Sequence, residues 1–137
     1  GDLDRAIFFF TRAIENDDTL AEAFVGLGNA YLEQGDAERA ADAYRLAAER
    51  RPGDGVVLYN LAVALFTIGA HVEAMDTARR VLGIRPDFAD AHYLLGRLLA
   101  DDPSQRAEAR QHFERFLMLA PADPKAESVR RWLAESR

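Results

Sequence analysis

The sequence predicts an all-α protein, built as a solenoid of antiparallel helical hairpins. A phrase of six residues recurs at an interval of 34 residues, as Gly1–Ala6, Gly35–Ala40 and Gly69–Ala74 in a chain of 137 residues. Leucine recurs with the same period at positions 27, 61 and 95. A fixed period of this length indicates a repeat array, in which each unit stacks on its neighbours. Such an array offers an extended surface, so the work expected of this protein is binding.

Each period contains two amphipathic helices. The first carries apolar or small residues at i, i+3, i+4 and i+7, which form one face of a helix: Phe24, Leu27, Gly28 and Tyr31. Gly35 ends this helix, and Asp36 is a suitable N-cap for the next one. The second helix covers residues 37–50 and stops at Pro52. The predicted unit is therefore a helical hairpin.

These residues carry a resemblance to a known family. The stretch 21–54 resembles a tetratricopeptide repeat over its full length and matches the positions that define the family: Phe24, Leu27, Gly28, Tyr31, Ala40, Tyr44, Ala47 and Pro52. Residues 55–88 and 89–123 match less completely. In the last repeat, His92 replaces the first large apolar residue, and one extra residue enters the turn before Pro103. The resemblance implies a right-handed superhelix whose concave groove holds peptide ligands.

The ends of the chain complete the predicted architecture as one domain of about eight helices. Residues 1–20 supply only the second helix of a truncated repeat, with Asp18 where proline would stand. Residues 124–137 form a single capping helix with one apolar and one charged side. Because the chain opens in mid-pattern and without methionine, we interpret it as a piece of a longer protein. Its alanine-rich and arginine-rich composition favours a bacterial source.

The candidate binding surface lies on the first helix of each repeat, opposite the core stripe. A solvent-facing stripe should be polar, but this one is largely apolar. The candidate peptide-binding residues are Val25, Asn29, Tyr59, Asn60, Val63, Phe66, Tyr93, Leu94 and Arg97. The alternative for the valines and leucines is that they form the core between repeats. Tyr59 and Tyr93 favour the groove, because tyrosine joins rigid apolar area to a polar tip.

Asn29 and Asn60 match the two asparagines of the carboxylate-clamp members of this family, which bind acidic chaperone C-termini. The positions that should carry lysine or arginine instead hold Val25, Asp90 and Leu94. We therefore reject a carboxylate clamp and expect the two amides to grip a peptide backbone.

The charges of the groove stripes predict the chemistry of the partner. Four carboxylates lie on them, at Glu22, Glu33, Asp90 and Asp101, against the single cation Arg97. An apolar segment with neutral or basic flanks, helical or extended, is the partner that this surface favours.

A second candidate surface lies on the helix of residues 1–20. Ile7, Phe8 and Phe9 stand on a face that has no preceding helix to cover it. We expect this face to mediate self-association into a homo-oligomer, unless residues upstream of Gly1 normally cover it.

Composition argues against several other functions. The net charge of -6 and the absence of cysteine weigh against nucleic acid, anionic lipid and thiolate metal sites. No apolar run reaches the ~18 residues of a membrane span. His71 begins a helix, His92 lies on a core stripe and His112 is expected to face outward, so no two of them share a ligand spacing. We expect no enzyme activity, cofactor or metal.

The sequence thus predicts a non-catalytic protein–protein interaction scaffold that binds a peptide or helix segment in its groove. The alternative is a regulatory or substrate-recruiting domain of a larger enzyme or assembly factor. A structural spacer with an empty groove is a third possibility, which the apolar strip of Tyr59, Phe66 and Tyr93 disfavours.

Overall fold

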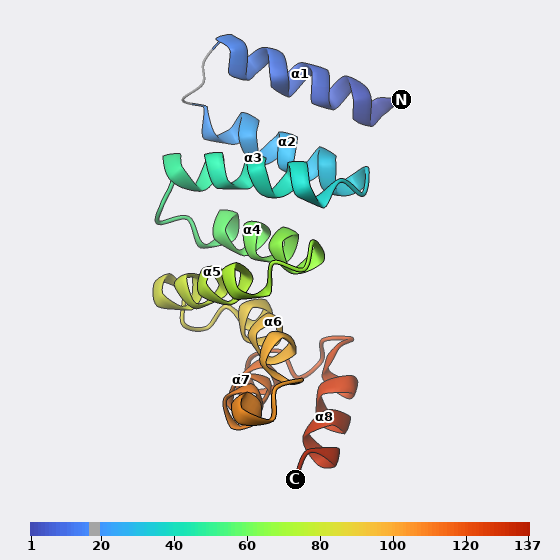
Figure 1. Ribbon diagram of the computed structural model, residues 1–137, viewed down its shortest axis with the longest axis vertical. Coiled ribbons are helices and arrows are strands. Elements are labelled where there is room, and N and C mark those ends of the chain that lie inside the picture. Colours follow the sequence, from blue (N-terminus) through green and yellow to red (C-terminus); the bar gives the residue numbers. More distant parts are fainter. Residues whose placement is uncertain (17–19) are drawn as a thin grey trace.

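The computed structural model describes residues 1–16 and 20–137, and all its regular elements in this part of the chain are helices. Their bounds are α1 (Asp2–Asn16), α2 (Ala21–Glu33), α3 (Ala37–Arg50), α4 (Gly55–Thr67), α5 (His71–Ile84), α6 (Ala89–Leu99), the 3₁₀ helix η1 (Pro103–Gln105), α7 (Arg106–Leu119) and α8 (Ala126–Glu135). Figure 1 shows them following one another along the long axis, with α8 beside α6 and α7 at the C-terminal end. The predicted all-α repeat fold is confirmed. Asp18 lies outside the described residues.

The turns form where the sequence signals predict them. Gly35 has φ 82° and Gly69 has φ 81°, a left-handed conformation that glycine adopts without a steric penalty. Asp36 then caps α3, because its Oδ1 accepts a hydrogen bond from the Arg39 amide at 3.1 Å. Each of the ranges 21–54, 55–88 and 89–123 consequently contains two α-helices that pack against each other.

Small residues allow the paired helices to approach closely. A Cβ added at Gly28 would lie 2.6 Å from the Tyr44 ring, and one added at Gly96 would lie 2.5 Å from the Phe113 ring. Tyr44 is 1% exposed and Phe113 is 3% exposed, so these rings fill the space that the glycines leave. Ala62, which is 0% exposed, occupies the same place in the middle repeat. Each hairpin core thus depends on one small residue in its first helix.

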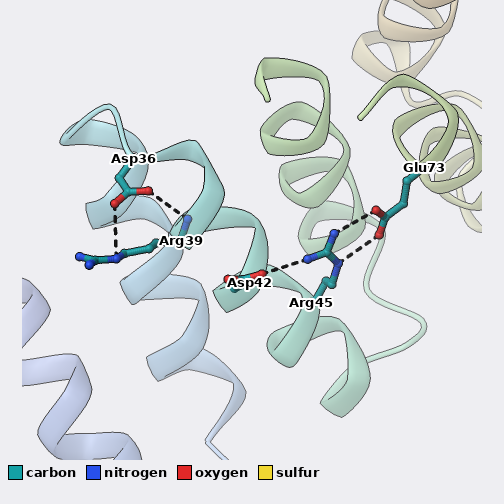
Figure 2. Close-up of polar contacts among 5 residues, drawn as sticks. All are labelled: Asp36, Arg39, Asp42, Arg45 and Glu73. Atoms are coloured by element: carbon teal, nitrogen blue, oxygen red, sulfur yellow. Dashed lines mark hydrogen bonds and ion pairs between the residues drawn. The ribbon is translucent and has the colours of Figure 1, made fainter. Parts of the chain in front are cut away.

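A recurrent ion pair joins the second helices of successive repeats. In Figure 2 the guanidinium of Arg45 on α3 reaches both carboxylate oxygens of Glu73 on α5, at 3.0 Å and 2.9 Å. One period later, Arg79 on α5 pairs with Glu108 on α7 at 3.1 Å. Exposed pairs of this kind contribute only about 0–1 kcal/mol each. The directed geometry of these pairs favours one orientation of a repeat against the next.

The C-terminal helix begins at Ala126, later than the predicted range 124–137. The Asp123 carboxylate accepts a hydrogen bond from the Lys125 amide at 2.8 Å, and this turn delays α8 until Ala126. The buried side of α8, which includes Val129, packs against Phe116 of α7. None of the helices in the described ranges combines the length and the apolar composition that a membrane span requires.

We expect opposite effects from adding a methyl group at two helical glycines. Gly28→Ala forces a Cβ against the buried Tyr44 ring and should lower the free energy of unfolding by about 1–3 kcal/mol. Gly83→Ala meets no atom within 4 Å in α5 and should raise it by about 0.5–1 kcal/mol through helix propensity. Urea denaturation of both variants tests this expectation. Equal effects at the two sites would contradict it.

Candidate functional site

A cleft with a volume of about 900 Å³ lies at the C-terminal end of the stack. Helices α4 to α8 all contribute to it. It is lined by Phe66, His71, Met75, Tyr93, Arg97, Leu98, Ala100, Asp101, Asp102, Gln105, Phe113, Ser128, Val129 and Trp132. Three residues of the predicted groove, Phe66, Tyr93 and Arg97, therefore come together in one cavity. This cleft combines aromatic surface with a few charged groups.

Arg97 is held in the cleft by aromatic rings. Its guanidinium carbon lies 5.4 Å from the centre of the Phe66 ring and 5.9 Å from that of Tyr93. One of its nitrogens donates a hydrogen bond to the Tyr93 hydroxyl at 3.3 Å. Among the described residues, no carboxylate forms an ion pair with this guanidinium. A positioned cation with unused N–H donors can bind acceptor groups of a ligand.

Helix α8 supplies a wall of the cleft that the sequence interpretation missed. Trp132 packs edge-on against Phe113 with ring centroids 5.0 Å apart, and Ser128 and Val129 lie beside it. His71 and Phe66 also line the cleft and stack with ring centroids 5.8 Å apart. The sequence treats α8 as a solvating cap. A tryptophan on its apolar side was the available signal that this helix offers aromatic surface.

The other predicted groove residues lie outside the lining of this cleft. Tyr59 is half-buried and packs on Phe88 with ring centroids 5.0 Å apart. Its pKa is raised, chiefly by burial and then by the nearby charge of Asp90. Asn60, Val63 and Val25 are half-buried, whereas Asn29 is exposed.

Leu94 has a different environment from the one predicted for a groove residue. It is 6% exposed and packs in the core with Ala62, Ala78 and Leu95. This placement agrees with the alternative role named for the leucines, as core between repeats. Leu94 therefore offers almost no surface to a ligand.

Cations from outside the groove stripes offset part of the predicted negative charge. Glu22 forms an ion pair with Arg51, and Asp90 pairs with the Lys125 ammonium at 3.5 Å. From the sequence, Arg97 was the single cation expected on this face beside the four carboxylates. Arg51 follows α3 and Lys125 precedes α8, so helical spacing gave no sign that their side chains reach this face.

A family model described as Tetratricopeptide repeat matches residues 1–55 and 25–87. The chain belongs to the tetratricopeptide repeat family. A curated relative, the small glutamine-rich tetratricopeptide repeat-containing protein 2 of Mycosarcoma maydis, is 31% identical over 90% of this chain and 34% of its own length. The chain thus spans about a third of that relative. The relative is fungal, so it gives no support to the bacterial source expected from composition.

Solved tetratricopeptide repeat structures share this fold. The crystal structure of MamA has a TM-score of 0.85 and 20% sequence identity, covering 99% of this chain and 87% of that chain. The first tetratricopeptide repeat domain of Spaghetti (RPAP3), bound to the HSP90 peptide SRMEEVD, has a TM-score of 0.76 and 23% identity, covering 85% and 94%. At these identities the likeness shows the fold alone.

Within the first complete repeat, Asn29 is held by the hairpin core. The hydroxyl of the buried Tyr44 donates to its Oδ1 at 2.6 Å. This bond uses the side-chain oxygen of Asn29 and not its amide nitrogen. Burial also raises the pKa of Tyr44 to about 12.

The third repeat contains a histidine pair that the sequence did not predict. His92 is buried, as expected, but His112 is half-buried against it and does not face outward. Their Nδ1 atoms lie 3.0 Å apart. The two residues are 20 positions apart on different helices, so their sequence spacing gives no hint of the contact. Among the described residues, no group of three or more His, Cys, Asp or Glu side chains could hold a metal ion.

Helix α1 carries the residues predicted for self-association. Phe8 and Phe9 are each 68% exposed, and Ile7 is half-buried. On another side of the helix, the Phe10 ring packs over Gly26 of α2. Two neighbouring phenylalanines are therefore open to solvent at this end of the stack.

Tyr44→Phe tests the bond that positions Asn29. We expect the free energy of unfolding at neutral pH to fall by about 1 kcal/mol, because the hydrogen bond to Oδ1 is lost. The Tyr44 pKa is about 12 in the fold against an ordinary value of 10.0, so the wild type should lose stability as pH rises from 10 towards 12. Urea unfolding across this range should show a shallower decline for Tyr44→Phe. Parallel declines would contradict the assignment.

Proposed function

We propose that this chain is a non-catalytic protein-interaction module that binds a segment of another protein. The segment lies along α2, α4 and α6, on the face that the family resemblance places in the concave groove, and its main anchor enters the cleft at α8. The observation that carries the proposal is the cleft itself. It has four aromatic side chains, Phe66, Tyr93, Phe113 and Trp132, around a guanidinium that pairs with no carboxylate of the described residues. Aromatic residues and arginine are the residue types that dominate binding energy at interfaces.

Polar groups along the same face suit a peptide backbone. Arg97 has N–H donors left after its bond to Tyr93. The oxygen of Asn29 accepts from Tyr44, and its amide nitrogen has no partner among the described residues. Both can donate to carbonyl oxygens of a bound segment. Asn60, which lies between Asn29 and Arg97 in the sequence, adds a second side-chain amide. This set fixes the course of a backbone without requiring a particular side chain.

The charges favour an apolar segment with neutral or basic flanks. Asp101 and Asp102 line the cleft, and Glu33 lies on the same face of α2. The cations of a carboxylate clamp are missing, because their positions hold Val25, Asp90 and Leu94. The acidic peptide SRMEEVD, bound by the Spaghetti domain, is therefore a poor analogue of the ligand proposed for this chain.

No catalytic role is included in this proposal. The histidines of the third repeat bond to each other instead of facing the cleft together. The alternative role, as a regulatory or substrate-recruiting domain of a larger enzyme or assembly factor, uses the same cleft. It differs only in what is attached to the module.

Selection from a random peptide library on the immobilised protein tests the groove. Selected peptides should share an apolar core, and Arg97→Ala should weaken their binding by about tenfold or more, because it removes the only guanidinium in the described cleft lining. Arg115→Ala, on the exposed part of α7, is the matched control and should bind like the wild type. A selected core peptide with lysine flanks should bind more tightly than its glutamate-flanked version. Tighter binding of the glutamate version, or equal binding by both arginine variants, would contradict the proposal.

A second proposal concerns α1, where we infer that Phe8 and Phe9 mediate contact with a second copy of the chain. Their exposure of 68% each is the observation that favours it. Sedimentation equilibrium should show a mass that rises with concentration, and the double variant Phe8→Ser, Phe9→Ser should remain a monomer. Val72→Ser removes a comparably exposed apolar residue from α5 and should associate like the wild type. A wild type that stays monomeric at high concentration would exclude this contact.

A further inference from the structure

The histidine pair of the third repeat has defined proton positions. The Nε2 atom of His92 lies 2.8 Å from the carbonyl oxygen of Pro86. A carbonyl oxygen only accepts, so this nitrogen must carry a proton and donate it. In the neutral ring, the Nδ1 of His92 is then an acceptor. Because the Nδ1 of His112 lies 3.0 Å away, it must carry the proton of the hydrogen bond between the rings.

The pair accepts one further proton without rearrangement. The Nε2 of His112 is the free site, and it lies 3.6 Å from a carboxylate oxygen of Glu108. That carboxylate also pairs with Arg79 of α5 at 3.1 Å. A proton at this nitrogen faces the Glu108 carboxylate and leaves both hydrogen bonds of His92 intact, although burial of the ring opposes the charge. The groups thus form a continuous chain from the carbonyl of Pro86 to the guanidinium of Arg79.

A second proton is incompatible with this geometry. Its only site is the Nδ1 of His92, which already accepts from His112. Two N–H groups on two cations would then face each other at a separation of 3.0 Å. Like charges at this distance repel strongly in a buried site, so the rings must separate.

We propose that His92 and His112 form an acid-sensitive latch between α6 and α7, which holds the C-terminal cleft in its binding geometry. Each latch residue precedes an aromatic residue of the cleft. Tyr93 follows His92, Phe113 follows His112, and the two rings pack with centroids 6.1 Å apart. Separation of the histidines displaces the helix turns that carry both rings. The cleft therefore loosens as the pair takes up its second proton.

The electrostatic environment of His112 also opposes the first proton. Burial, followed by the charge of His92 and of Arg79, lowers the pKa of His112 below its ordinary 6.5, while Glu108 acts in the opposite sense. A histidine whose pKa is lowered in the fold binds fewer protons there than in the unfolded chain. Its contribution to stability is complete above pH 6.5 and is lost as pH falls through the lowered value.

The other hairpins provide an internal control. Phe24 and Ala43 stand in α2 and α3 at the places of His92 and His112, and Leu58 and Thr77 stand there in α4 and α5. None of these four side chains takes up a proton in this range. Acid should consequently loosen the third hairpin before the first two.

Nitrogen-detected NMR of the unliganded wild type tests the proton positions. At about pH 7.5 we expect His92 to carry its proton on Nε2 and His112 on Nδ1. The reverse arrangement in either ring would overturn the latch, because the contact between the two Nδ1 atoms would then have another origin.

Hydrogen exchange tests the opening of the latch, again without ligand. Between about pH 7.5 and about pH 5.5, after correction for intrinsic rates, amides of α6 and α7 should lose protection several-fold more than those of α2 and α3. His112→Asn keeps a donor near the Nδ1 position and cannot be charged, and its amide can turn to accept from a protonated His92. This variant should lose no extra protection in α6 and α7. An equal loss in wild type and variant, or a loss spread evenly over the hairpins, would overturn the proposal.

The effect on binding rests on the proposed function and is measured separately. A peptide from the library selection should bind the wild type several-fold more weakly at about pH 5.5 than at about pH 7.5, with a smaller change for His112→Asn. Equal pH dependence in the two proteins would separate the latch from the cleft and overturn the coupling. If no peptide binds at any pH, the proposed function fails, whereas the exchange experiment still decides the latch.

Discussion

Close contact between the two helices of each hairpin is the constraint on which the rest of this structure depends. The first helix presents a small residue at Gly28, Ala62 and Gly96, and a bulky ring meets it in the outer two hairpins. At Gly28 and Gly96, even one methyl group would overlap with that ring. This contact sets the distance between the helices and hence the angle at which the next hairpin begins. A surface that extends over several repeats is possible because a close approach at a small residue recurs in every period.

Polar interactions refine this arrangement without supplying most of its stability. The pairs of Arg45 with Glu73 and of Arg79 with Glu108 occupy equivalent positions in successive repeats. Because their side chains are exposed, solvent screens much of their attraction. Arg45 binds both carboxylate oxygens of Glu73, and Arg79 contacts one oxygen of Glu108. This geometry nevertheless favours one orientation of each second helix relative to the next. Glu108 has a further partner in His112, so the last of these contacts also connects the stack to an ionisable group.

The periodic features of the fold could be predicted from sequence because they depend on neighbours within one helix or one hairpin. The turn at Gly35, the cap at Asp36 and the helix pairs follow from such local rules. Contacts between residues of different repeats have no comparable local pattern in the sequence. Leu94 follows the groove stripe by helical spacing, yet its side chain is enclosed by Ala62 and Ala78 of the preceding hairpin. Lys125 reaches Asp90 through a turn whose path the pattern does not encode.

The cleft lies where the chain departs from its own repeat. Helix α6, the first helix of the third repeat, has histidine in place of a large apolar residue. The turn after it has an extra residue and contains the 3₁₀ helix η1. Helix α8 then brings Trp132 to the cleft. In a uniform array every groove segment would be alike, so no position could be distinguished by a ligand. Local departures create one segment with its own depth, aromatic surface and charge. We therefore expect recognition to concentrate at this end, while the regular repeats provide the rigid frame that keeps its walls in place.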